Sequence, residues 1–161
     1  MRIFLDANVL FSAAKSDGAV RRFVEVILNA GHECVVDAYV VEEARRNLAA
    51  KAPGTIEFFE ALSRRLSNVP VVAGVPALPT DVLLPADDRP VLAAAIRNRC
   101  DALVTGDRTH FGALYGKTIG GVAVHSPRSL AEALSLAEAR SKGALHAPAA
   151  PYRVRRIRVR R

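Results

Sequence analysis

The sequence predicts an α/β domain built on a parallel β-sheet, and two observations support this fold class. Short β-branched runs alternate with helical patterns along the chain, which is typical of parallel strands joined by crossover helices. The 161 residues suffice for one domain with a tail, and 50% of them are hydrophobic while 24% are charged. That composition is ordinary for a globular protein and excludes a chain that is disordered throughout. No apolar run approaches the ~18–20 residues that a membrane span needs, so no membrane association is expected.

The first half of the chain is predicted to form two strands and three helices. The strands are short apolar runs, and the helices have apolar residues that recur at helical spacing. Gly31 ends the first helix, Asp37 is the N-cap of the second, and Pro53–Gly54 separates the second from the third. In chain order the expected elements are strand Arg2–Leu5, helix Ala19–Asn29, strand 34–36, helix Ala38–Lys51 and helix 55–66.

The second half continues the same alternation after a proline-rich loop. Pro90 suits the first turn of a helix, and residues 102–105 (ALVT) form a short apolar strand. The expected elements are strand 69–73, loop 74–85, helix 90–99, strand 102–105, strand 122–124 and helix 127–137. From about residue 140 the composition shifts to Lys, Gly, Ala and Pro, which predicts a linker. We therefore expect a domain at residues 1–139 and a linker with an arginine-rich tail at 140–161.

The positive charge is concentrated at the end of the chain. The formal net charge is +7, and six arginines lie in the last ten residues, YRVRRIRVRR, which contain no acid. Residues 1–151 therefore hold 17 basic and 16 acidic side chains and are nearly neutral. The tail could follow a nucleic-acid backbone, add a strand to a neighbour, or serve only as a solvated segment.

The cysteines and the N-terminus favour a cytoplasmic protein. Cys34 and Cys100 form no metal-binding cluster, so they are expected to be reduced, buried thiols. The sequence MRIFLDANVL reaches an aspartate after three apolar residues, which is not the pattern of a signal peptide.

Four acidic residues stand out by their positions relative to the predicted elements. Asp6 and Asp107 each follow a strand, so both face the crevice where open α/β sheets bind ligands. Asp88 lies at the start of a helix, and Glu43 lies inside another helix with Asn47 one turn on. Taken singly, each is more often a turn former, a cap or a solvated side chain. Spacing alone leaves both interpretations open.

The chemistry that needs such a set is metal-dependent phosphodiester hydrolysis. Several carboxylates at one point repel each other unless a cation neutralises them. Oxygen ligands without histidine or cysteine favour Mg²⁺ or Mn²⁺ over zinc. Such a site polarises a phosphoryl oxygen and activates water for in-line attack.

Four local motifs carry a resemblance to a known family. They are FLDANVLFSA around Asp6, VVEEARRNL around Glu43, DDRPVLAAAI around Asp88 and LVTGDRTHF around Asp107. In this order, over residues 2 to about 130, they resemble the PIN-domain nucleases. The resemblance implies a three-layer α/β/α sandwich with a mainly parallel sheet. It also implies an Mg²⁺- or Mn²⁺-dependent endoribonuclease that acts on single-stranded RNA and leaves 5′-phosphate and 3′-hydroxyl ends.

The motif match assigns the site residues. Catalytic and metal-binding roles go to Asp6, Glu43, Asp88 and Asp107, and supporting roles to Asn8 and Thr105. Glu43 is preferred to Glu42 because it fits the spacing of the buried helix face. Asp88 is preferred to Asp87 because it precedes PVLAAAI at the matching distance.

Basic residues beside the acids are candidates for contacts with RNA. Arg89 and Arg108 directly follow two of the acids, so they either hold phosphates or only balance the neighbouring charge. His110, three residues after Asp107, is close enough to approach the substrate, although a surface or helix-start histidine is the favoured interpretation.

The resemblance extends to VapC-type toxins, with which the chain shares the pattern from Thr105 and Asp107 to Phe111. It implies a homodimer and, for a toxin, a small antitoxin partner. Two other functions compete. A haloacid-dehalogenase-like phosphatase needs acids where Asn8 and Phe111 stand, and a non-catalytic RNA- or partner-binding module would have no need of all four acids.

Overall fold

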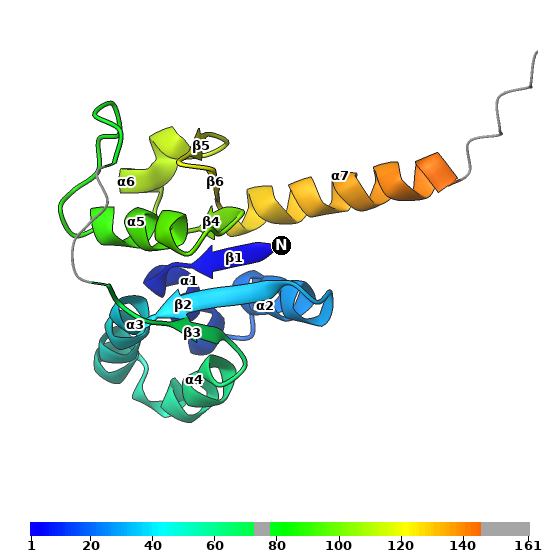
Figure 1. Ribbon diagram of the computed structural model, residues 1–161. Helices are drawn as coiled ribbons and strands as arrows, with labels where there is room; N and C mark the ends of the chain where they lie inside the picture. The colour runs from blue at the N-terminus through cyan, green and yellow to red at the C-terminus, as the bar shows by residue number, and fades with distance from the viewer. Residues whose placement is uncertain (73–77, 146–161) are drawn as a thin grey trace, which may run out of the picture.

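The computed structural model describes residues 1–72 and 78–145, and Figure 1 shows the arrangement of the elements. The helices and strands, with two 3₁₀ turns labelled η, alternate along the chain as the sequence predicts. They are β1 (Arg2–Leu5), α1 (Ala7–Lys15), α2 (Ala19–Asn29), β2 (Glu33–Asp37), α3 (Ala38–Lys51), η1 (Pro53–Thr55), α4 (Ile56–Ser63), β3 (Ser67–Val69), α5 (Arg89–Arg97), β4 (Ala102–Val104), α6 (Arg108–Phe111), η2 (Gly112–Leu114), β5 (Thr118–Ile119), β6 (Val122–His125) and α7 (Pro127–Leu145).

The strands form one sheet in the order β3-β2-β1-β4-β6-β5, and only the β5–β6 pair is antiparallel. β1 is central, with Ile3 opposite Cys34 on one side and opposite Ala102 on the other. From β1 the chain moves outward to β2 and β3, and then crosses back to β4. The strand order therefore reverses between β1 and β4, which is where ligands bind in such sheets.

Helices cover both faces of this sheet. Because crossovers between parallel strands are right-handed, the helices between β1 and β3 lie on one face and α5, between β3 and β4, lies on the other. On the first face α1 contacts α2, α3 and α4, while α5 contacts β4. The fold is therefore the predicted α/β/α sandwich with a mainly parallel sheet.

The core lies on both sides of the central strands. β1 and β4 are buried on both faces, which explains why their sequences are continuous apolar runs. The largest fully buried side chains include Phe4 from β1, Phe59 from α4, Leu92 from α5 and Phe111 from α6. Among the described residues, no helix has the length and apolar character needed to cross a membrane.

Several elements differ from the prediction. The strand expected at 69–73 is at Ser67–Val69. This short edge strand contains polar residues, so an apolar sequence pattern does not reveal it. The helix expected at 55–66 is shorter, because η1 precedes it and α4 ends at Ser63. Three further elements, α1, α6 and β5, are short and were not predicted from the sequence.

The last helix is longer than predicted. α7 runs from Pro127 to Leu145 rather than ending at residue 137, because alanine, glutamate, arginine and lysine sustain a helix without an apolar face. The start of the expected linker at residue 140 is therefore helical. The arginine-rich segment lies outside the described residues, and the division into domain and tail stays a prediction.

Candidate active site

The four acids singled out in the sequence line one cleft. It has a volume of about 390 Å³ and lies at the carboxyl ends of β1 and β4, where the strand order reverses. Each acid comes from a different part of the chain, and the fold brings them together. The residues that line the cleft are Asp6, Asn8, Ser12, Glu43, Asp88, Val91, Gly106 and Asp107.

Asp6 is the most buried of these acids. Only 6% of the residue is exposed, because it follows the buried strand β1 and caps α1 through a 2.7 Å hydrogen bond from the backbone N–H of Ala7 to Oδ1. Burial raises the pKa of Asp6 to about 6, although hydrogen bonds from Thr105, Ala7 and Asn8 act in the opposite direction. A nearby cation would stabilise the ionised form of such a buried carboxylate.

Asn8 links the ends of the two central strands. Its Nδ2 donates to Oδ2 of Asp6 at 2.7 Å and to Oγ1 of Thr105 at 3.1 Å, and its Oδ1 accepts from the N–H of Gly106 at 2.6 Å. Thr105 is fully buried, and its Oγ1 also accepts from the N–H of Asp107 at 3.1 Å. Asn8 and Thr105 therefore lie directly beside the acids, and their supporting role stays a prediction.

Glu43 lies on the cleft side of α3, whereas its neighbour Glu42 does not line the cleft. Glu42 is exposed and forms an ion pair with Arg45 instead. Burial raises the pKa of Glu43, and the negative charges of Asp88 and Asp87 add to that rise, while Arg46 opposes it. The helix face thus separates the two glutamates in the way the buried positions of α3 predict.

Asp88 precedes α5 but its side chain makes no cap hydrogen bond with that helix. Burial raises its pKa, the charge of His110 lowers it, and Asp107 and Asp87 raise it further. Asp87 is exposed and lines an adjoining polar cavity with Asp88, where its backbone oxygen accepts from the Tyr39 hydroxyl at 3.2 Å. Of the two aspartates, Asp88 is the one that reaches the cleft.

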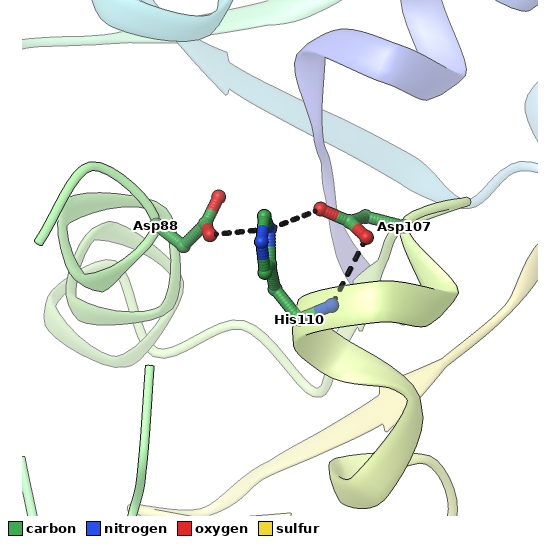
Figure 2. Close-up of side chains that lie close together, drawn as sticks. All are labelled: Asp88, Asp107 and His110. Carbon is green, nitrogen blue, oxygen red and sulfur yellow. Dashed lines mark hydrogen bonds and ion pairs between the residues drawn. The ribbon is translucent and has the colours of Figure 1, made fainter. Parts of the chain in front are cut away.

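Asp107 caps α6 and contacts His110. Its Oδ1 accepts from the N–H groups of Thr109 at 2.9 Å and His110 at 3.1 Å. Burial alone would raise the pKa of Asp107, but the hydrogen bonds and charge of His110 outweigh it and lower the pKa. His110 Nδ1 lies 2.8 Å from Asp107 Oδ2 and 2.9 Å from Asp88 Oδ2, and Figure 2 shows the ring between the two carboxylates.

The two arginines that are candidates for RNA contacts, Arg89 and Arg108, lie in different surroundings. Arg108 is exposed and lines a groove of about 830 Å³ that adjoins the cleft, since both are lined by Ser12 and Gly106. Tyr115 and Arg128 also line this groove. Arg89 is half-buried at the first position of α5, next to Asp88.

Ser12, Val91 and Tyr115 carry no sequence pattern that places them beside the acids, because the cleft and the groove depend on tertiary structure. The sequence places His110 near the site but favours a surface or helix-start role for it. The residue is exposed and lies in a helix, yet it bridges two acids, and its position three residues after Asp107 was the only signal of this contact.

The donor set fits a divalent cation. Four carboxylates from separate elements face one cleft, and oxygen ligands of this type suit Mg²⁺ and Mn²⁺. The ligand atoms of Asp88, Asp107 and His110 all lie within 4.8 Å of one another. The negative charge of Asp88 raises the pKa of Glu43, and that of Asp107 raises the pKa of Asp88; a bound cation would oppose both effects.

Comparison with solved structures shows the same fold. The chain is similar to a chain of the VapBC2 complex from Rickettsia felis, solved bound to a promoter DNA fragment, with a TM-score of 0.59 and 15% identity over 78% of this chain and 98% of that one. It is also similar to a chain of FitAB bound to the IR36 DNA fragment, with a TM-score of 0.52 and 19% identity over 78% and 94%. A chain of VapBC-1 from nontypeable Haemophilus influenzae matches with a TM-score of 0.52 and 11% identity over 80% and 99%.

The sequence itself supports the same assignment. No protein of curated function matches the chain. A family model for the PIN domain matches residues 2–109, which include all four acids of the cleft. The chain therefore belongs to the PIN-domain family.

Proposed function

We propose that the protein is a metal-dependent ribonuclease that hydrolyses phosphodiester bonds of single-stranded RNA with Mg²⁺ or Mn²⁺. The observation that carries the proposal is the convergence of Asp6, Glu43, Asp88 and Asp107 on one cleft at the reversal of strand order. PIN domains are generally nucleases, so this convergence has a functional counterpart in the family.

In this proposal the acids hold the cation, and the residues around them keep the acids in place. Asp6, Asp88 and Asp107 bind the principal ion and Glu43 completes the site. When bound, the ion supplies Lewis-acid activation of the phosphodiester and of water. Asn8 orients the Asp6 carboxylate by donating to Oδ2, and the N–H groups at the start of α6 hold Asp107.

Basic residues beside the cleft are proposed to position the RNA. Arg108 lines the adjoining groove, so its guanidinium can contact a phosphate next to the scissile one without reading sequence. Tyr115 in the same groove offers a ring on which a base of a single strand can stack. Arg89 is proposed as a second phosphate contact beside Asp88.

The proposed partners follow from the family. The fold neighbours are parts of VapBC and FitAB complexes, which supports a role as the toxin of a toxin–antitoxin pair with a small antitoxin as partner. A homodimer is proposed as the working assembly. We propose the cytoplasm as its location, where two free, buried cysteines remain reduced.

The direct test is cleavage of single-stranded and structured RNA by the full chain with Mg²⁺, Mn²⁺ or EDTA. We expect cleavage of the single strand with either metal and none with EDTA. Asp6→Asn and Asp107→Asn should lower the rate at least about 100-fold, because each removes a charged metal ligand. Glu42→Gln is the matched control, since Glu42 lies on the same helix as Glu43 but pairs with Arg45, and it should cleave normally.

The same assay separates the alternatives. RNA binding without cleavage, equal with metal and with EDTA, would indicate a binding module. Hydrolysis of p-nitrophenyl phosphate without RNA cleavage would indicate a phosphatase. The structure gives that alternative little support, because Asn8 uses its amide to hold Asp6 and Phe111 is fully buried.

A further inference from the structure

His110 stands between two acids of the cleft, and the function proposed above gives it no task. Its ring comes from α6, while Asp88 precedes α5, so the fold brings the ring against an acid that lies far from it in the sequence. Its Nδ1 lies 2.9 Å from Asp88 Oδ2 and 2.8 Å from Asp107 Oδ2. Figure 2 shows that both carboxylates turn one oxygen toward the same nitrogen.

The two separations from Nδ1 suit neighbouring donors on one cation, and the ligand atoms of all three residues lie within 4.8 Å of one another. Ligand atoms at adjacent corners of an octahedron with bonds of about 2.1 Å lie about 3 Å apart. Both separations from Nδ1 are close to this value. Asp107 also uses Oδ1 for the backbone N–H groups of Thr109 and His110, which leaves Oδ2 as the oxygen that faces the ring.

The imidazole nitrogen of His110, as the third donor, distinguishes between classes of cation. Mg²⁺ is a hard ion that takes oxygen ligands, whereas transition-metal ions accept imidazole nitrogen readily. An imidazole with its hydrogen on Nε2 presents a lone pair at Nδ1, which is the nitrogen that faces the carboxylates here.

We propose that His110 is a metal ligand together with Asp88 and Asp107, and that it makes this centre bind Mn²⁺ in preference to Mg²⁺. The inference rests on the proposed function, which places a divalent cation in the cleft, and it specifies which class of cation the centre selects. His110 thus has a role beyond balancing the two acids.

A purely electrostatic role for His110 predicts the opposite effect. If the ring only served as an internal positive partner for the two carboxylates, it would compete with any cation. Removing it would then strengthen the binding of Mg²⁺ and Mn²⁺ alike. A ligand role predicts weaker binding of Mn²⁺ and little change for Mg²⁺.

The experiment measures metal binding directly, without RNA. The metal-free full chain is titrated with Mn²⁺, with free Mn²⁺ followed by electron paramagnetic resonance, and with Mg²⁺ by calorimetry. His110→Asn keeps a polar donor near the Nδ1 position, and His110→Ala removes it. His32→Ala is the control, because His32 lies at the opposite end of β1 and contacts the N-terminal amine.

We expect the wild type to bind Mn²⁺ at least about tenfold more tightly than Mg²⁺. His110→Asn should lower the affinity for Mn²⁺ about tenfold and change the affinity for Mg²⁺ by less than about twofold. His110→Ala should lose at least as much Mn²⁺ affinity, and His32→Ala should match the wild type. Bound Mn²⁺ should show a ¹⁴N coupling in electron spin-echo modulation, and both His110 variants should lose it.

The inference is overturned if the wild type shows no ¹⁴N coupling, or if the His110 variants bind both metals as tightly as the wild type or more tightly. Either result leaves the ribonuclease proposal intact if Asp6→Asn still abolishes cleavage. A protein that binds Mn²⁺ through His110 but cuts no RNA would instead contradict the proposed function and support the ligand role.

Discussion

Asn8 links the carboxyl ends of the two central strands, β1 and β4, through side-chain hydrogen bonds. Its amide joins Asp6 to Thr105 and Gly106 through three hydrogen bonds, two donated by Nδ2 and one accepted by Oδ1, so both polar atoms of the side chain have partners. A β-carbon on Gly106 would lie 3.1 Å from Asn8 Oδ1, which indicates how closely the loop after β4 approaches the amide. The position of Asp6 therefore depends on a residue that bears no charge.

Replacement of Asn8 tests this dependence. Asn8→Ala removes the donor to Asp6 and should lower the rate of RNA cleavage about 10- to 100-fold, which is typical when a metal ligand loses its hydrogen-bond partner. Asn8→Asp should lower it further, because a second carboxylate beside Asp6 disfavours the ionised form of both. Cleavage rates are measured at saturating Mn²⁺, with thermal unfolding to verify folding. Asn29→Ala, at the exposed end of α2, is the control and should cleave at the wild-type rate. If both Asn8 variants also cleaved at the wild-type rate, Asn8 would not be needed to position Asp6.

The two cysteines offer a test of burial that is independent of the cleft. Burial raises the pKa of Cys34 to about 12 and of Cys100 to about 11, from an ordinary value of 9.0. Because only the thiolate reacts, and a raised pKa lowers the thiolate fraction at a given pH, both should resist alkylation at pH 8. For Cys34 the thiolate fraction falls about a thousandfold.

Mass spectrometry after treatment with iodoacetamide measures this resistance. The native chain should remain unmodified under conditions in which the chain in guanidinium chloride reacts at both positions. Ser16→Cys, at the exposed C-cap of α1, supplies a thiol that should react in the native protein. Rapid modification of Cys34 in the native wild type would show that β2 opens readily.

At the scale of elements, the tight turn between β5 and β6 depends on glycine. Gly120 and Gly121 both have positive φ, of 56° and 86°, in the hairpin that forms the only antiparallel pair of the sheet among the described residues. A β-carbon on Gly120 would approach the side chain of Ile96 to 2.8 Å, so the turn also packs closely against α5. Both the positive φ and the lack of space beside Ile96 therefore favour glycine at position 120.

Gly120→Ala should therefore destabilise the fold by about 1–3 kcal/mol, through strain at positive φ and overpacking against Ile96. In a chain of this size that lowers the midpoint of thermal unfolding by several degrees, which calorimetry detects. Gly112→Ala is the matched control, because Gly112 has a φ of −56° and no atom within 4 Å of the added carbon. If both variants unfolded at the wild-type temperature, the close approach to Ile96 would be wrong.

Much of the element structure was predictable, and the failures have physical causes. The boundaries of α2 and α3 follow from an apolar periodicity and from clear stop and cap residues, Gly31 and Asp37. β3 was misplaced because an edge strand of three residues need not be apolar. α1 was missed because its nine residues follow β1 without a break.

The candidate site was predictable in its acids but not in its contacts. Asp6 and Asp107 follow strands, and that position alone places them at the sheet edge. The contact of His110 with Asp88 joins a residue of α6 to the residue that precedes α5, so no local sequence pattern predicts it. The part of the site that depends on side-chain packing between distant segments could only come from the structure.

At the scale of the whole molecule, the acids of the cleft and the arginine-rich segment lie in different parts of the chain. The acids converge on one cleft of the domain, whereas six arginines lie in the last ten residues. Under the proposed function, an acidic cleft repels RNA phosphates until a cation binds, and we expect the basic segment to help capture the RNA. Residues 1–151 carry nearly equal numbers of basic and acidic side chains and so provide little net positive charge.

Deletion of residues 152–161 tests the contribution of that segment. Each phosphate contact on a single strand adds about 0.7 to the slope of log affinity against log salt. If all six arginines contact phosphates, deletion should reduce the slope by up to about 4 and weaken binding most at low salt. Fluorescence anisotropy with labelled RNA between 50 and 300 mM salt, roughly the range in which such slopes are measured, gives both values. An unchanged affinity and slope would show that the segment does not contact RNA.

The central position of β1 has a consequence for how the protein is made. β1 leaves the ribosome before the other described elements, but its neighbour β4 follows about a hundred residues later, which takes roughly 5–20 s at ordinary rates of synthesis. Until then β1 can pair only with β2, and the wall of the cleft that contains Asp107 does not exist. Under the ribonuclease function proposed above, a nascent chain should therefore be unable to cut RNA, its own messenger RNA included, until β4 and Asp107 have been synthesised.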